Sequence, residues 1–255
     1  MACWPLSPAA LRFGSRAVSD LVSYPIPWDL VFGLWPNILQ RTPTSVDAFS
    51  AAICARIHPE PLVIGSKNLP TSARFVLVAN HYQRPGLWIM HAASVLTQAI
   101  RQHYGPGDPP VRWMVTANWP PIKLGPLHFR SPGDILLPRV ADALACYPVS
   151  FVGANPAYTA RSLRRILREA PHLNRPLGIF PEGVAGFAGR LSHPLQGVDR
   201  LFSHLAKHGL PLQPAGISEA EGRLVVRFGT GISCAELMTE QDGAALAMQR
   251  IAQLI

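Results

Sequence analysis

The chain of 255 residues has few charges, few lysines, few cysteines and no long uninterrupted apolar run. Charged residues make up 15% of it and apolar residues 48%, which is more apolar than an average soluble domain. The cysteines lie far apart and show no CxxC spacing, so we expect neither a zinc site nor a disulfide framework. A reduced, cytosolic setting is therefore expected. The cysteines are Cys3, Cys54, Cys146 and Cys234.

The longest candidate for a membrane span, residues 21–40, is interrupted by Asp29 and three prolines. A spanning helix needs about 20 mostly apolar residues, so we expect no transmembrane span here. The aromatic residues of this stretch suit a helix lying in the lipid headgroup region or a segment packed on the protein's own core. They are Tyr24, Trp28, Phe32 and Trp35. The first 16 residues lack the pattern of a secretory signal.

Positive charge prevails, and nearly all of it is arginine. The formal net charge is +8, and lysine occurs only at Lys67, Lys123 and Lys207. This excess predicts an anionic partner. No basic run with interleaved aromatics indicates nucleic acid, so we expect an anionic membrane surface at the cytoplasmic face, bound peripherally. The densest cluster has the spacing of one helical face, which fits a solvated face or a phosphate-facing patch: Arg161, Arg164, Arg165 and Arg168.

Apolar runs punctuated by Pro and Gly predict strands that alternate with helices. We expect a loosely helical, Pro-interrupted segment over 1–58 and an α/β domain over 59–255, with a largely parallel sheet and helices on both faces. Expected strands are 61–65, 74–80, 111–117, 146–153, 176–180, 210–217 and 223–229; expected helices are 85–100, 134–145, 157–170 and 194–209, with further turns over 234–255. Chemistry in such sheets collects at the carboxyl ends of strands, where Asn80-His81 and Pro181-Glu182 fall.

Three stretches in the same order resemble one family. Residues 63–81 read VIGSKNLPTSARFVLVANH, residues 177–183 read LGIFPEG, and residues 193–217 read HPLQGVDRLFSHLAKHGLPLQPAGI. Together they resemble the glycerolipid acyltransferases of the lysophosphatidate acyltransferase type, over about Val63 to Gly229. The resemblance implies an acyltransferase-like α/β fold. It also implies acyl transfer from a thioester, on acyl-CoA or acyl carrier protein, to a lipid hydroxyl.

The resemblance assigns His81 as the general base, since a neutral imidazole can take the proton of an attacking hydroxyl. Taken alone, His81 would read as a capping or packing residue at a strand end. Glu182 is expected as the second catalytic residue, in the acceptor site, and neither a cofactor nor a metal is expected beyond the acyl carrier. The remaining expected substrate-binding positions are Asn80, Arg84, Phe180, Pro181, Gly183 and Arg190.

The first motif departs from the family at Gly86. The family places an Asp there, with four residues between it and the His, to orient the ring and stabilise its charged form. The equivalent loss in a serine protease triad costs about 10⁴ in turnover. Either another acid substitutes, or His81 works alone at a reduced rate, or the protein no longer catalyses. Candidate acids are Asp108, Asp134 and Glu182.

The acceptor site departs as well. Many members follow Phe-Pro-Glu-Gly with Thr-Arg-Ser, where this chain has residues 184–186, Val-Ala-Gly. A second family arginine aligns loosely with Ser150 or Phe151. Because a phosphate requires bidentate arginine donors, a less charged acceptor fits this chain. Arg84 and Arg190 would restore a phosphate contact unless they are solvated surface residues.

The sequence is compatible with two functions, which belong to different classes of protein. The first is a membrane-associated acyltransferase; the second is a catalytically silent relative that binds lipid or acyl carrier as a scaffold or regulator. Gly86 favours the second, whereas the retained His81 and Glu182 favour the first. His204 and His208 stand four apart on an expected helix, but no third ligand follows, so we interpret them as helix-surface residues.

Overall fold

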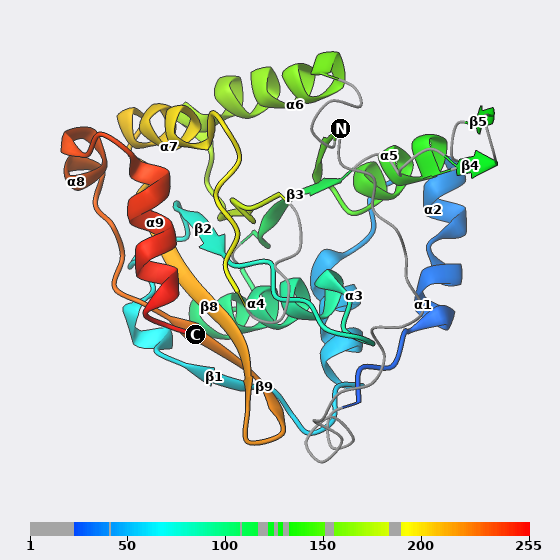
Figure 1. Ribbon diagram of the computed structural model, residues 1–255. Helices are drawn as coiled ribbons and strands as arrows, with labels where there is room; N and C mark the ends of the chain where they lie inside the picture. Colours follow the sequence, from blue (N-terminus) through cyan, green and yellow to red (C-terminus); the bar gives the residue numbers. More distant parts are fainter. Residues whose placement is uncertain are drawn as a thin grey trace.

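The computed structural model describes residues 23–40, 42–107, 109–116, 122–124, 127–129, 133–150, 156–183 and 190–255. Its centre is a seven-stranded sheet (Figure 1). The strands of this sheet are β1 (Leu62–Ile64), β2 (Val76–Ala79), β3 (Arg112–Thr116), β6 (Tyr147–Val149), β7 (Leu177–Ile179), β8 (Leu212–Ala220) and β9 (Arg223–Phe228). A separate antiparallel hairpin consists of β4 (Ile122–Leu124) and β5 (Leu127–Phe129).

The sheet has the order β1-β9-β8-β2-β7-β3-β6 and is largely parallel, as the sequence predicts. Five strands, from β8 to β6, run in one direction. β9 returns antiparallel to β8 through a tight turn at Glu221-Gly222, where both residues have positive φ, and β1 lies parallel to β9. The five-strand part brings the carboxyl ends of β2, β3 and β7 to one edge.

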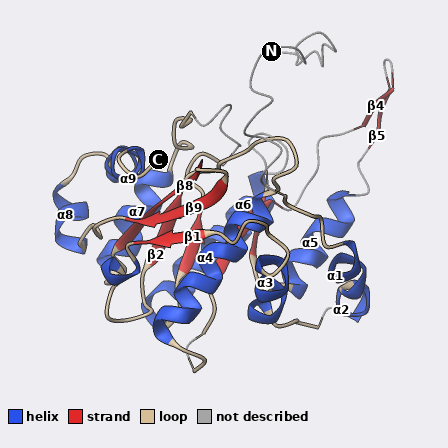
Figure 2. Cartoon of the chain, turned by 90° about the horizontal axis from the view of Figure 1, so that it is seen from below, coloured by secondary structure: helices blue, strands red, loops and turns tan. Residues whose placement is uncertain are grey.

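Helices cover both faces of the sheet (Figures 1 and 2). Successive β2 side chains point to opposite faces, so Val76 and Val78 pack with α6, α7 and α9, whereas Leu77 and Ala79 pack with α3 and α4. The helices are α1 (Trp28–Gly33), α2 (Trp35–Gln40), α3 (Val46–Cys54), α4 (Ile89–Tyr104), α5 (Gly133–Ala143), α6 (Pro156–Glu169), α7 (Val198–Lys207), α8 (Cys234–Thr239) and α9 (Gly243–Ala252), with 3₁₀ turns at Ser66–Asn68 and Ala170–His172.

The expected start of α4 at Pro85 is wrong. Pro85 and Gly86 instead occupy the middle of a tight turn, in which the Leu87 N–H donates to the Arg84 carbonyl at 3.1 Å. Gly86 has φ of +86°, which a helix excludes and a type II turn requires at its third residue. The helix begins at Ile89, after Trp88 has donated its N–H to the His91 ring.

The helices α1 and α2 lie nearly in line and are apolar on two sides (Figure 1). Leu34 and Ile38 are buried in a small cluster with Ala143 of α5. On the other side, large apolar side chains at spacings of four, three and four residues remain exposed: Trp28, Phe32, Trp35 and Leu39. The segment thus packs partly on the protein's own core and presents an apolar stripe to solvent. No described helix is both long and apolar enough to cross a bilayer.

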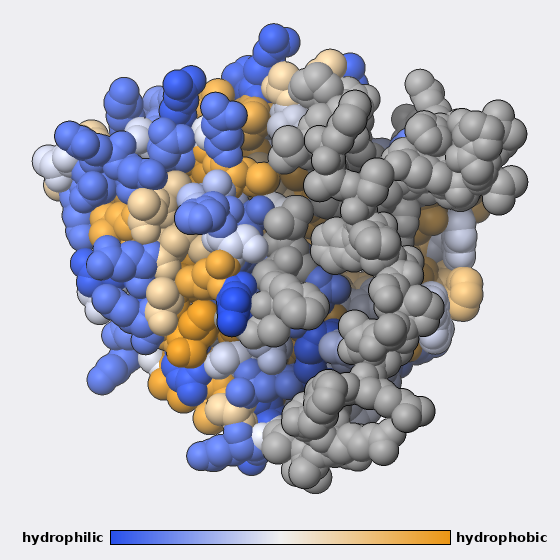
Figure 3. Space-filling model, in the orientation of Figure 1, coloured by the Kyte–Doolittle hydropathy of each residue, from blue (hydrophilic) through white to orange (hydrophobic). Residues whose placement is uncertain are grey.

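The arginine cluster lies on the outer side of α6, and all four of its members are exposed. Arg165 forms an ion pair with Glu169 at 2.8 Å. Hydrophilic side chains also form the outer margin of the face shown in Figure 3, over α6, α7 and α8. The described cysteines are free thiols, and Cys3 lies outside the described residues.

Candidate active site

The two motifs meet at neighbouring strand ends. Strands β2 and β7 pair in parallel, with Val76 opposite Leu177 and Val78 opposite Ile179. Asn80-His81 directly follows β2, and Phe180 to Gly183 directly follow β7. The register therefore places His81 beside Glu182, although 101 residues separate them in the chain.

Glu182 contacts the backbone of His81 rather than its ring. One carboxylate oxygen accepts the N–H of His81 at 2.5 Å, and the other accepts the N–H of Ser192 at 2.6 Å. The side chain is only 1% exposed. Burial raises the pKa of Glu182, and the two backbone hydrogen bonds oppose that rise. Glu182 therefore joins three chain segments around the site.

The imidazole of His81 has no acid beside it among the described residues. Its Nδ1 atom is buried without a hydrogen-bond partner there, and no described carboxylate bonds either ring nitrogen. Burial lowers the pKa of His81, so the ring is neutral near pH 7. Of the candidate acids, Asp134 lies on α5, Glu182 bonds only the backbone, and Asp108 lies outside the described residues.

Asn80 joins β2 to β8 just beyond the end of their ladder. Its amide nitrogen donates to the Ile217 carbonyl at 2.9 Å, and its amide oxygen accepts the Ile217 N–H at 2.7 Å. The side chain is 3% exposed and thus copies a backbone pairing inside the protein. Because these two hydrogen bonds hold Asn80 against β8, they fix the backbone directly before His81.

Arg84 is engaged by Glu219, the next-to-last residue of β8. The guanidinium forms an ion pair with the Glu219 carboxylate and lies over the Tyr24 ring, 4.7 Å from its centroid. The Tyr24 hydroxyl donates to the same carboxylate. The charge of Arg84 is therefore compensated within the protein. Arg190, by contrast, is exposed.

The remaining motif residues shape the turn after β7. The Phe180 ring meets the His81 ring edge to face, with centroids 5.5 Å apart at 62°. Pro181 is buried, and its carbonyl accepts the N–H of Leu195 at 2.9 Å. Gly183 has φ of +63°, and a Cβ there would lie 2.1 Å from a Leu195 methyl carbon. Only glycine fits at that position without displacing Leu195.

Two of the regions expected to contact the acceptor fall outside the part of the chain that the structure describes. Residues 184–186 and Phe151 lie outside the described residues. Ser150 directly follows β6. Its backbone N–H donates to the Thr159 hydroxyl, and its carbonyl accepts a hydrogen bond from that hydroxyl. The acceptor-site departures of the sequence therefore stay predictions.

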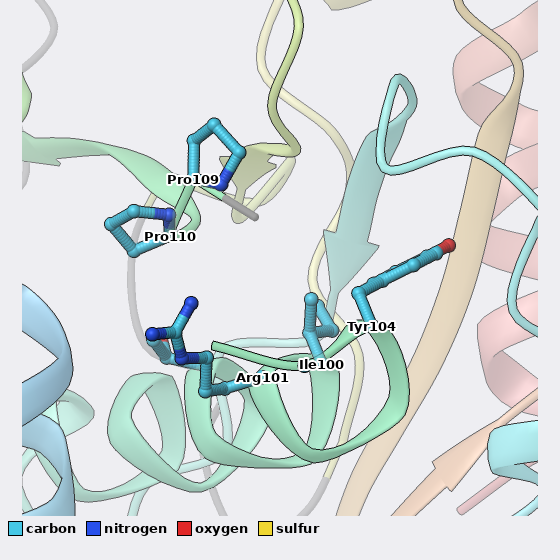
Figure 4. A pocket seen from close by; sticks show the side chains of 7 residues that line it. Ile100, Arg101, Tyr104, Pro109 and Pro110 are labelled. Carbon is cyan, nitrogen blue, oxygen red and sulfur yellow. The ribbon is translucent and has the colours of Figure 1, made fainter. Parts of the chain in front are cut away.

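Two other features lie away from this site. A shallow hollow at the C-terminal end of α4 is lined by Ile100, Arg101, Tyr104, Pro109 and Pro110, and no motif residue lines it (Figure 4). The rings of His204, on α7, and His208, directly after that helix, lie 4.7 Å apart. Within the described part of the chain, no three His, Cys, Asp or Glu side chains gather as metal ligands would.

Sequence reasoning missed four residues around the site: Tyr24, Trp113, Ser192 and Glu219. Ser192 contributes only its backbone N–H, which any residue except proline would supply. Glu219 lies near the end of β8, after a run of buried residues. A carboxylate at such a position is the sequence pattern that could have indicated it. Nothing in the local sequence of Trp113 links it to Phe180.

The geometry is that of an α/β fold carrying a His and a Glu at neighbouring strand ends. No family model and no curated protein matches the chain. A solved structure does match: the 1-acyl-sn-glycerophosphate (LPA) acyltransferase PlsC from Thermotoga maritima, with a TM-score of 0.52. The alignment covers 82% of this chain and 76% of that one at 14% sequence identity. The chain therefore has an acyltransferase fold, as its sequence predicts.

The lowered pKa of His81 predicts a specific pH dependence of stability. The folded chain takes up this proton at lower pH than the unfolded chain, whose His titrates near the ordinary value of about 6.5. The contribution of His81 to the free energy of unfolding is therefore complete above that value and is lost as the pH falls toward the folded pKa. We expect wild type to lose more stability between about pH 7.5 and about pH 5 than His81→Gln does.

Urea denaturation at several pH values measures this difference. His91 also has a pKa lowered by burial, but it is present in both proteins and cancels in the comparison. Parallel stability profiles for wild type and His81→Gln would show that His81 is not desolvated as described.

Proposed function

We propose that the protein is an acyltransferase that moves a fatty acyl group from acyl-CoA or acyl carrier protein to a hydroxyl of a lipid acceptor. His81 is its general base. The observation that carries the proposal is the hydrogen bond from the His81 N–H to Glu182, which joins both family motifs at neighbouring strand ends. The acyltransferase fold of the chain supports it.

The chemistry follows from a neutral, buried imidazole. His81 takes the proton of the acceptor hydroxyl while the hydroxyl oxygen attacks the thioester carbonyl. The carbon–sulfur bond then breaks, and the imidazolium returns the proton to the departing thiolate. Backbone N–H groups would stabilise the oxyanion between these steps. Glu182 holds the His81 backbone in place throughout and transfers no proton.

The acceptor is a lysophospholipid or a less charged lipid, and the charges around the motif favour the latter. Of the two arginines expected to hold a phosphate, Arg84 already has Glu219 as its counter-ion. A dianionic phosphate would have to compete with that carboxylate, and each such contact needs a guanidinium that can turn toward the ligand. Arg190 is exposed and stays a candidate for a phosphate contact.

The site of action is an anionic membrane surface, bound peripherally at the cytoplasmic face. The exposed stripe on α1 and α2 supplies aromatic and aliphatic side chains suited to the headgroup boundary. Trp88 extends the stripe, since its ring meets Trp28 with centroids 5.9 Å apart. The net positive charge adds attraction to anionic lipid.

A catalytically silent homologue, which binds lipid or acyl carrier as a scaffold or regulator, is the second candidate. The Nδ1 of His81, which has no hydrogen-bond partner among the described residues, and the glycine at position 86 favour it. Two measurements of acyl transfer separate the candidates.

Replacement of the base is the first. Transfer of labelled acyl groups from acyl-CoA and from acyl carrier protein into a mixed lipid extract is measured for wild type and His81→Ala. We expect His81→Ala to reduce transfer by at least about 10²-fold, the usual contribution of a general base. His172→Ala, an exposed histidine in a 3₁₀ turn, serves as the matched control and should retain the rate. If wild type transfers label from neither donor yet binds lipid, the silent homologue is correct.

Restoring the family's acid is the second. An ideal Cβ at Gly86 meets no atom within 4 Å, so a side chain has space there. Its positive φ disfavours most residues, but Asp and Asn tolerate it better than others. We expect Gly86→Asp to raise the turnover about tenfold by stabilising the imidazolium, and Gly86→Asn to give no such rise. Equal rates for the two variants would contradict a role for charge at this position.

Membrane binding is tested separately by sedimentation with vesicles of mixed anionic and neutral phospholipid. We expect the double variant Trp28→Ser/Phe32→Ser to bind at least about tenfold more weakly, because it loses two large apolar contacts with the headgroup boundary. Met238→Ser removes an equally exposed apolar side chain from α8 and should bind as wild type does. Unchanged binding of the double variant would place the lipid contact elsewhere.

A further inference from the structure

The orientation of the His81 ring needs a physical cause. Glu182 fixes the backbone of His81, but a backbone contact leaves both side-chain torsions free. Among the described residues, the buried Nδ1 has no partner, and residue 86 has no side chain to offer one. Packing is therefore what can hold the ring.

An aromatic pair provides that packing. The His81 ring meets Phe180 edge to face at 5.5 Å, an arrangement that the ring quadrupoles favour. Phe180 in turn stacks on Trp113, with centroids 5.0 Å apart and planes only 9° from parallel. Trp113 is 4% exposed, so the indole forms a rigid base beneath the phenyl ring.

The plane of Trp113 is itself fixed from α4. The indole N–H donates to the Thr97 hydroxyl at 3.0 Å, and this hydroxyl donates to the Ala93 carbonyl at 2.8 Å. Thr97 is 1% exposed. A chain of contacts thus runs from α4 through β3 and the end of β7 to the end of β2, across elements that lie together in Figure 1.

Gly178 makes room for this stack. It is the direct partner of Trp113 in the β3–β7 register, and a Cβ at this position would lie 2.3 Å from the indole carbon Cε3. Gly178 of β7 and Phe180, directly after this strand, point to the same side of the sheet, so the indole covers the glycine and reaches Phe180. Glycine weakens a strand interior, and the close approach of the ring is the physical reason for it here.

We propose that Trp113 and Phe180 are positioning residues that orient the imidazole of His81 in place of the acid expected at position 86. The inference rests on the proposed role of His81 as the base. Packing fixes the ring but supplies no negative charge to an imidazolium. The stack therefore replaces one of the two roles of the missing acid.

Gly178→Ala tests the proposal without removing any aromatic ring, because the added methyl group displaces the indole. Gly107→Ala is the matched control, since an ideal Cβ there meets nothing within 4 Å. NMR of the His81 ring protons, assigned with His81→Gln, reports ring-current shifts, contacts with Phe180 and the titration midpoint. We expect Gly178→Ala to lose the contacts and shift the midpoint upward toward about 6.5, whereas Gly107→Ala matches wild type.

Phe180→Leu provides a second variant should Gly178→Ala unfold, and Phe180→Tyr is its conservative counterpart. We expect Phe180→Leu to behave as Gly178→Ala does and Phe180→Tyr to retain the wild-type signals. In acyl-transfer assays, Phe180→Leu should lower kcat about ten- to hundredfold with little change in KM, since ring misplacement affects the transition state. Phe180→Tyr should restore most of kcat.

The outcomes separate the two hypotheses. If folded Gly178→Ala keeps the wild-type contacts with Phe180 and the wild-type midpoint, or if folded Phe180→Leu keeps the wild-type titration midpoint of His81, the positioning role is overturned, whatever the activity. If the signals change but wild type transfers no acyl group, the stack does orient the ring and the proposed acyltransferase function fails. Changed signals together with a fall in kcat support both.

Discussion

The candidate site depends on one buried carboxylate. Glu182 satisfies the backbone N–H groups of His81 and Ser192, two donors that no strand ladder pairs. A buried carboxylate is unfavourable unless such donors surround it, and buried N–H groups need an acceptor equally. The Glu182 carboxylate and the two backbone N–H groups thus each need the other as a hydrogen-bond partner. The consequence is that the loop after β2 and the turn after β7 take up one arrangement, in which Asn80 adds a second connection to β8.

In a His-Asp pair, the acid orients the ring and stabilises its charged form, and this structure separates the two roles. Phe180 contacts the ring from one side and is itself stacked on Trp113, so orientation has a physical basis without an acid. Among the described residues nothing comparable compensates the charge, and burial lowers the pKa of His81. A base with a low pKa is neutral over a wide pH range but accepts a proton less readily. Under the proposed function, the protein is therefore a slow catalyst rather than a fast one.

The sequence predicted the fold class and placed Asn80-His81 and Pro181-Glu182 at the carboxyl ends of strands, because alternating strands and helices determine where strand ends gather; it did not show that Glu182 reaches His81. It did not predict the turn at Pro85-Gly86, since proline and glycine suit both a helix start and a type II turn, and only the positive φ of Gly86 decides. The contacts of Glu219 with Tyr24, and of Trp113 with Phe180, depend on strand register and on side chains distant in sequence. No local pattern encodes such pairs.

The apolar stripe and the candidate site are physically continuous. Trp28 of the stripe contacts Trp88, which precedes the first turn of α4, and Tyr24 lies under the guanidinium of Arg84 in the loop that follows His81. Under the proposed function, a lipid surface that meets α1 therefore contacts the same loop that carries the base. Because Tyr24 and Arg84 share Glu219 as their acceptor, a displacement of the N-terminal segment would disturb the ion pair that holds this loop against β8. Under the proposed function, a few short-range interactions thus link membrane contact to the geometry of His81, with no need for a distant conformational change.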